Sequence, residues 1–150
     1  MSALHRNAVT IQARLRDLGL EIEPRELDSS ARTAAEAAAS LGTTVGQIVK
    51  SLVFFRADEA VIVLCAGDRR VDADRRGLRV ANAKEAKAAT GFAIGGIPPL
   101  GHEQPLETII DASLRRFDIV WCAAGTTHAV FPVPISALIA AIPGAVVEEM

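Results

Sequence analysis

Residues 51–66, SLVFFRADEAVIVLCA, decide the fold class of this chain. Residues 51–55 and 60–66 are two runs rich in β-branched, aromatic and aliphatic side chains, the composition that favours strands. The short polar stretch 56–59 separates them, and this arrangement is typical of a β-hairpin. The sequence therefore predicts two paired strands near the middle of the chain.

The sequence before this hairpin indicates helices. Apolar side chains recur at near-helical spacing over residues 7–20. Thr33 begins a capping-box pattern that leads into an alanine-rich run. A similar pattern begins at Thr44, which predicts a second, shorter helix that carries Ile48 and Val49.

The sequence after the hairpin alternates between strand and helix signals. A charged connection over 68–79 comes first, then a helix that Asn82 can cap and an irregular loop over 95–102 rich in glycine and proline. The remaining predicted elements are strands at 108–111, 118–124 and 129–133, a helix over 135–142 and a last strand over 145–147. We therefore expect one domain over residues 1–150, with a mixed α/β fold whose strands are antiparallel or mixed.

The composition excludes several classes of protein. Of the 150 residues, 50% are hydrophobic and 23% are charged, which excludes intrinsic disorder. Sixteen Lys and Arg against eighteen Asp and Glu give a net charge of -2, which excludes a highly basic nucleic-acid coat but not a selective binder. Cys65 and Cys122 lie far apart in apolar runs, as reduced core cysteines do, and the N-terminus lacks an apolar leader. We expect a cytoplasmic protein that does not bind membranes.

Common catalytic motifs are missing from the sequence. Residues 42–51 resemble a phosphate-binding loop, but Val49 stands where that loop needs a glycine before Lys50. There is no Gly-x-Ser-x-Gly or Gly-x-Gly-x-x-Gly pattern, and the three histidines are too scattered to predict a zinc site.

Six segments carry a resemblance to a known family. They are SARTAAEAA at 30–38, VGQIVKSLVF at 45–54, GDRRVD at 67–72, GGIPPLGH at 95–102, ID at 110–111 and AGTTH at 124–128. In this order they resemble the YbaK/ProX family of aminoacyl-tRNA deacylases, which are free-standing relatives of the editing domain in bacterial prolyl-tRNA synthetases. The resemblance covers roughly Thr33 to the C-terminus.

This resemblance implies a fold, a reaction and partners. The implied fold is a mixed, partly barrel-like sheet flanked by helices, with a cleft for the tRNA 3′ end. The implied enzyme is a hydrolase that proofreads translation by cleaving the ester of a tRNA, such as tRNA-Pro, mischarged with a small amino acid such as Ala, Cys, Ser or Thr. No cofactor and no metal are implied, because the ester is already activated. The implied partners are the aminoacyl-tRNA 3′ end and an aminoacyl-tRNA synthetase; monomer and homodimer both stay open.

Three residues are the catalytic candidates under this resemblance. Lys50 matches the essential lysine of the family, although a lysine that ends a helix and stabilises its dipole would look the same. The main-chain N–H of Gly95, with that of Gly96, would polarise the ester carbonyl, unless the Gly-x-x-x-Pro pattern is only a turn. His128 would orient water or contact the substrate, and its alternative is a solvated loop histidine.

Further residues are candidates for substrate binding. His102 would line the adenosine site, and Asp111 would either shape the pocket or cap the turn at 112–114. No residue stands out as a general base, so the resemblance suggests that the substrate's own hydroxyl or amino group places the water. The full set of predicted binding residues is Gly96, Pro99, His102, Asp111, Gly125 and Thr127.

The arginines of the charged connection have two interpretations. They are either a contact strip for acceptor-stem phosphates or a loop of solvated ion pairs. They are Arg69, Arg70, Arg75, Arg76 and Arg79. Two alternative functions also stay open: a non-catalytic module that binds a nucleotide or a tRNA end, and an unrelated α/β protein that acts through oligomerisation.

Overall fold

The fold is described for residues 4–150 of a computed structural model. It contains four α-helices, two short 3-10 helices and eight strands within this range. The helices are α1 (Arg6–Asp17), α2 (Ala34–Leu41), η1 (Val45–Gln47), α3 (Ala83–Thr90), η2 (Ala112–Arg116) and α4 (Ile135–Ala141). The strands are β1 (Arg25–Glu26), β2 (Val49–Arg56), β3 (Glu59–Ala66), β4 (Arg79–Val80), β5 (Glu107–Asp111), β6 (Ile119–Ala123), β7 (Ala129–Pro134) and β8 (Val146–Glu148).

The strands form two open sheets with mixed pairing. One sheet has the order β4-β2-β3-β5-β8, in which β3, β5 and β8 run parallel, and the other has the order β1-β7-β6 and is antiparallel. The hairpin predicted from residues 51–66 is confirmed as β2 and β3, which pair along their whole lengths. Ile62 and Leu64 of the larger sheet share one buried core with Phe131 and Val133 of the smaller sheet. The mixed α/β class predicted from the sequence is therefore confirmed.

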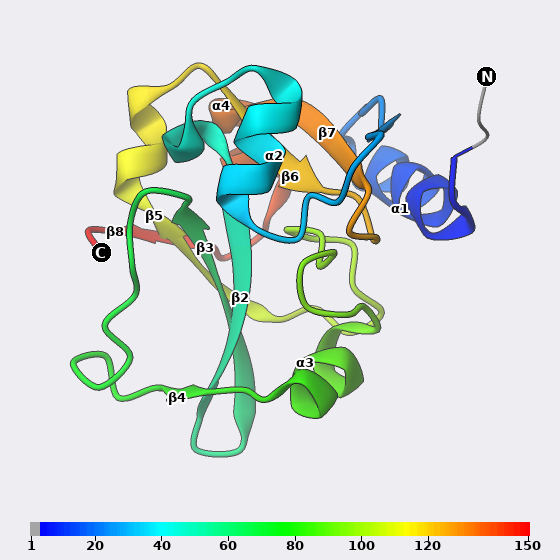
Figure 1. Cartoon of the computed structure of the whole chain (residues 1–150). Coiled ribbons are helices and arrows are strands. Elements are labelled where there is room, and N and C mark those ends of the chain that lie inside the picture. Colours follow the sequence, from blue (N-terminus) through cyan, green and yellow to red (C-terminus); the bar gives the residue numbers. More distant parts are fainter. Residues whose placement is uncertain (1–3) are drawn as a thin grey trace.

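Strand β2 connects the two sheets. Figure 1 shows β2 running from the end where α2 and β6 lie to the end where β4 lies. A parallel bridge between Ile48 and Trp121 joins the start of β2 to β6. The predicted helix at 44–49 is wrong in its second half, because only residues 45–47 are helical and Val49 pairs with Ala66 of β3. The strand pairing available to Ile48 and Val49 outweighs the local helix signal.

Most of the other local predictions are confirmed. The side chain of Thr33 caps α2 by accepting from the Glu36 N–H at 3.1 Å. Asn82 and Glu85 form a reciprocal capping box at the start of α3. The strands predicted at 108–111, 118–124 and 129–133 are β5, β6 and β7, with ends shifted by one residue. Among the described residues, no helix combines the length and the apolar character needed to cross a membrane.

Candidate functional site

A cavity of about 280 Å³ opens where the two sheets diverge, and we name it the Thr33 cavity after the residue at its rim. Its walls come from β2, β6, the segment that leads into α2 and the loop before Pro98. Most of the lining is aliphatic, and the polar or charged side chains that line it are those of Arg32, Thr33, Lys50 and Ser51. The sequence places these four in segments that carry the family resemblance, but only Lys50 is among the predicted site residues.

None of the strands described within residues 4–150 pairs with the edge of β2 at Ser51. The Val53 carbonyl accepts from the Ala81 N–H at 3.1 Å, on the side of β2 that faces β4. Main-chain groups two residues apart in a strand point to the same edge, so the N–H and C=O of Ser51 also point there. On this edge β4 pairs only from Phe54 onward, and β6 reaches only Ile48. Ser51 therefore presents main-chain hydrogen-bonding groups that are not paired with any of the eight described strands.

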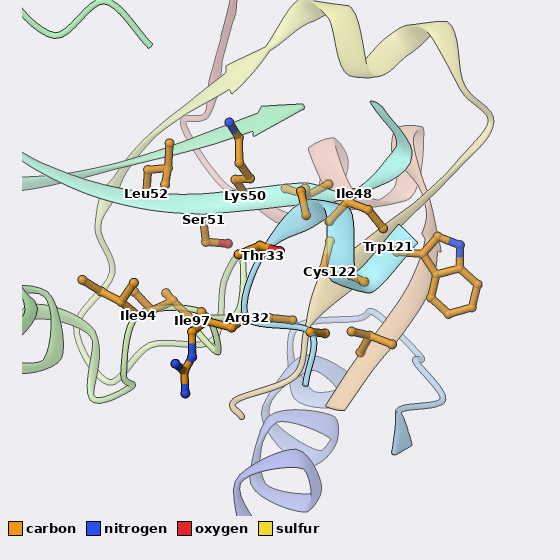
Figure 2. Close-up of a pocket in the computed structure, with 17 residues that line it drawn as sticks. Arg32, Thr33, Ile48, Lys50, Ser51, Leu52, Ile94, Ile97, Trp121 and Cys122 are labelled. Carbon is orange, nitrogen blue, oxygen red and sulfur yellow. The ribbon is translucent and has the colours of Figure 1, made fainter. Parts of the chain in front are cut away.

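The side chains of Lys50 and Ser51 lie on opposite sides of β2. Figure 2 shows Ser51 directed toward Thr33 and the Lys50 ammonium directed away from it. The ammonium donates to the Arg69 carbonyl at 2.6 Å. Lys50 thus borders the cavity without placing its ammonium inside it. The alternative that Lys50 ends a helix is wrong, because it lies in β2 opposite Cys65.

Three polar or charged residues that line the cavity, Arg32, Thr33 and Ser51, were not predicted as site residues. The Ser51 hydroxyl is buried and has no hydrogen-bond partner within residues 4–150. Arg32 is exposed at the mouth of the cavity, and no ion pair involving it is found in the same range. Ser51 follows Lys50 in the family motif and Arg32 precedes Thr33, so their positions beside recognised residues were the available signal.

The loop at Gly95 interlocks with the loop at residues 125–128. Gly95 lines the Thr33 cavity at φ +93, and a Cβ there would lie 3.2 Å from the Arg32 Cγ. The Gly96 N–H already donates to the Ala93 carbonyl at 3.0 Å, which leaves Gly95 as the better placed of the two predicted amide donors. The Ala31 N–H donates to the Thr127 carbonyl at 2.5 Å, so the rim of the cavity is tied to the second loop.

The remaining loop candidates lie outside the cavity wall. His128 is exposed, and its Nδ1 lies 3.1 Å from the hydroxyl of Thr127. The Gly125 carbonyl accepts from the Asn7 side chain at 3.0 Å, and Pro99 is buried. None of these side chains lines the Thr33 cavity, so their roles in substrate binding stay predictions.

His102 holds its own loop. Its Nε2 lies 2.8 Å from the Pro98 carbonyl, which makes Nε2–H the donor. Burial lowers the pKa of His102 below its ordinary value of 6.5. The hydrogen bond to the Pro98 carbonyl raises this pKa, and the charge of Arg14 lowers it by a smaller amount than burial does. The neutral ring is therefore the form that the fold stabilises, and the predicted adenosine contact stays a prediction.

This pKa shift predicts a pH-dependent stability. The folded-state pKa of His102 lies below the unfolded value of 6.5. At pH values between these two pKa values, the unfolded chain therefore binds more protons than the folded chain. The free energy of unfolding should therefore hold above about pH 7 and fall as the pH drops through 6.5 toward the folded pKa. Urea unfolding from about pH 8 to about pH 5 measures this, and His102→Gln should flatten that part of the profile. If the free energy of unfolding of His102→Gln depends on pH as that of the wild type does, another group causes the pH dependence.

Asp111 serves the backbone rather than the cavity. It is 1% exposed, and its carboxylate accepts from the N–H groups of Ala66 and Ser113, both at 2.9 Å. It is the N-cap of η2, which agrees with the capping alternative for this residue. The side chain of Asp111 does not line the Thr33 cavity.

The arginines of the charged connection are dispersed. Arg69 lies 3.9 Å from Asp68, Arg76 pairs with Glu148, and Arg79 pairs with Glu85 at 3.0 Å. Arg70 and Arg75 have no ion-pair partner among the described residues, and they line different cavities. The interpretation as a loop of ion pairs therefore fits three of the five arginines. Arg70 and Arg75 remain the candidates for contact with tRNA phosphates.

The chemistry of the Thr33 cavity is limited by its lining. Within the described part of the chain, no Asp, Glu or His lines it, so it offers no carboxylate or imidazole as a general base. Cys122 lines it, but burial raises the pKa of this thiol well above its usual range, which excludes a populated thiolate near neutral pH. The arrangement suits a substrate that is already activated and needs only placement and polarisation.

Comparison with known protein families identifies the family of this chain. The model of the aminoacyl-tRNA editing domain matches residues 28–141, a range that contains all six segments of the resemblance. The chain belongs to the aminoacyl-tRNA editing domain family. The family assignment made from the sequence motifs is therefore confirmed.

Individual relatives of this editing domain differ in length. The uncharacterized protein YwhH of Bacillus subtilis is 30% identical over 115 residues, which cover 72% of this chain and 73% of YwhH. A proline–tRNA ligase of Lactobacillus gasseri is 30% identical over 88 residues, which cover 54% of this chain and 16% of the ligase. A solved structure of a candidate trans-editing enzyme for prolyl tRNA synthetase is 40% identical, covers 98% of each chain and has a TM-score of 0.90.

Proposed function

We propose that this editing domain hydrolyses the ester bond of a tRNA that carries a small, incorrect amino acid, acting in trans to prolyl-tRNA synthetase. Water attacks the ester carbonyl carbon, the bond from that carbon to the ribose oxygen breaks, and a water proton passes to the ribose oxygen. The products are the free amino acid and a tRNA with an intact 3′ end. The likeness to a candidate trans-editing enzyme and to part of a proline–tRNA ligase supports the choice of prolyl-tRNA.

The observation that carries the proposal is the Thr33 cavity, which is small and mainly apolar and has polar groups at its rim. At about 280 Å³ it lies just below the range of cavities that hold drug-sized ligands, so it suits a small aminoacyl group. The Gly95 main chain and Lys50 border it, and both are candidates to stabilise the negative charge that develops on the carbonyl oxygen. The missing general base is consistent with a substrate group that positions the water.

The non-catalytic alternative keeps one observation in its favour. The Lys50 ammonium donates to the Arg69 carbonyl and does not enter the cavity. A module that only holds a tRNA end needs no ammonium inside the cavity, so this contact fits the alternative.

Deacylation of a mischarged panel separates the two functions. Purified protein is incubated with tRNA-Pro carrying Ala, Cys, Ser or Thr, and with tRNA-Ala, tRNA-Ser and tRNA-Thr carrying their own amino acids. We expect hydrolysis of one or two of the mischarged tRNA-Pro species at a rate at least about tenfold above spontaneous hydrolysis. Binding of these tRNAs without any hydrolysis would overturn the enzyme and support the binding module.

A further inference from the structure

Helix α1 packs against the loop at residues 95–102 and against the loop at residues 125–128. Figure 1 shows α1 beside the turn that leads into β7, which is the second of these loops. Both loops lie inside residues 28–141, the range that the family model matches, whereas α1 precedes this range. Helix α1 therefore contacts the two loops from outside the matched part of the chain.

Two polar side chains of α1 each donate to one loop. The Asn7 side-chain amide donates to the Gly125 carbonyl at 3.0 Å. The Arg14 guanidinium donates to the Gly101 carbonyl, also at 3.0 Å. Asn7 and Arg14 are seven positions apart, a spacing that places two residues on the same face of an α-helix. One face of α1 thus carries a hydrogen-bond donor for each loop.

The contact at Gly125 leads to Gly95 through closely packed backbone. A Cβ at Gly125 would lie 3.0 Å from the Asn7 Cβ and 3.2 Å from the Asn7 carbonyl oxygen, so helix and loop are in direct contact. The next residue, Thr126, contributes the backbone atoms against which Gly96 packs. Gly96 adjoins Gly95, the candidate amide donor in the cavity wall. A shift of the Gly125 carbonyl is therefore transmitted to Gly95, because close-packed atoms cannot move independently.

The attachment of α1 to the domain has a separate, apolar cause. The side chains of Ala8, Ile11 and Leu15 are fully buried in the main core. The two bonds to the loops are made in addition to this core. A third polar side chain of α1, that of Gln12, makes the same kind of bond as Asn7, from its amide to the Ile22 carbonyl at 3.1 Å. Ile22 belongs to neither loop, so Gln12 is a control that the chain itself provides.

We infer that Asn7 and Arg14 are positioning residues that act through the two loops. Their hydrogen bonds hold the loops so that the Gly95 main chain stays in the wall of the Thr33 cavity. Neither side chain lines this cavity, so neither acts on the substrate directly. The inference rests on the proposed function, because the placement of the Gly95 amide affects a rate only if the cavity catalyses hydrolysis.

The first test compares Asn7→Asp with Gln12→Glu in the full chain. Each change keeps the shape of the side chain and replaces the amide donor by a carboxylate oxygen that faces a carbonyl. We expect Asn7→Asp to lower kcat for mischarged tRNA-Pro at least about fivefold and to leave KM within about twofold, because the loop that carries Gly95 shifts. Gln12→Glu should leave both constants within about twofold of wild type.

A second pair of variants tests the contact of Arg14. Arg14→Met should lower kcat at least about threefold, and Arg14→Lys should recover most of this loss because it keeps a donor for the Gly101 carbonyl. Arg16→Met is the matched control, since Arg16 lies on the same helix and pairs with Glu21 at 3.6 Å, away from the loops. Its kcat should equal that of the wild type.

An NMR spectrum of the isotope-labelled protein provides a readout that does not depend on hydrolysis. Asn7→Asp should shift the amide signals of Gly95 and Gly96, and Gln12→Glu should leave both signals in place. A wild-type protein that deacylates no tRNA would refute the proposed function. The shifts would then still show whether α1 sets the geometry of the loops.

Three outcomes would overturn the inference. The first is a spectrum of Asn7→Asp in which the Gly95 and Gly96 signals are unchanged. The second is an equal loss of activity in Asn7→Asp and Gln12→Glu, which would assign both bonds to general stability. The third is a rise in KM at constant kcat in Asn7→Asp, which would indicate a contact with the substrate instead of positioning.

Discussion

Replacement of Lys50 by alanine is expected to lower the rate of deacylation at least about a hundredfold, the usual loss when one group that stabilises a developing oxyanion is removed. Two cationic residues, Arg32 and Lys50, line the Thr33 cavity, and the family resemblance makes Lys50 the catalytic candidate of the two. An ester bound in this cavity lies beside β2, the strand from which the Lys50 side chain extends. We expect the Lys50 ammonium to exchange the Arg69 carbonyl for the ester oxygen when substrate binds, because its four-carbon stem is flexible.

A structural role for Lys50 requires a separate control. Lys50→Met keeps an unbranched stem of similar length and removes the charge, so it should lose as much activity as Lys50→Ala. The free energy of unfolding should change by about 1 kcal/mol or less in both variants, because a single partly exposed hydrogen bond is lost. The measurements are single-turnover deacylation of mischarged tRNA-Pro and urea unfolding. Activity within about threefold of wild type in Lys50→Met would show that the charge of Lys50 is not used in catalysis.

Gly96→Ala is expected to lower kcat/KM about a hundredfold by moving the loop that carries Gly95, since displacements of about 1 Å have effects of this size. A Cβ at Gly96 would lie between 2.7 and 2.9 Å from three backbone atoms of Thr126. Backbone cannot rotate away as a side chain can, so the two interlocked loops must separate. The same overlap should lower the free energy of unfolding by about 1–3 kcal/mol.

Gly91→Ala is the matched control for this prediction. Gly91 has φ +85 at the end of α3, and a Cβ there would meet no atom within 4 Å. This variant should lose about 1 kcal/mol of stability through backbone strain and keep wild-type activity. Single-turnover deacylation and urea unfolding of the two variants separate a general loss of stability from a displaced site. A Gly96→Ala protein as active as Gly91→Ala would mean that the Gly95 loop does not contribute to catalysis.

The candidate site could be predicted only in part from the sequence. Lys50 and Gly95 lie in motifs that can be recognised, and both line the Thr33 cavity. Arg32 and Ser51 stand beside recognised residues, but neither residue type at these positions indicates a cavity. His102 and Asp111 were plausible ligands as residues, and the structure shows both in hydrogen bonds to backbone groups. Such bonds join positions that are not fixed relative to one another until the chain is folded.

The sequence by itself determined the features that depend on neighbours in the chain. The β2–β3 hairpin and the Asn82 capping box follow from residue preferences over a few positions, and the family follows from the order of short motifs. The tertiary structure alone decided that Ile48 and Val49 are extended, because partners on β6 and β3 compete with the helix. It also decided that Ser51 faces the Thr33 cavity while Lys50 points away. Strand alternation requires adjacent residues to face opposite sides, but only the packing of the second sheet determines which side holds the cavity.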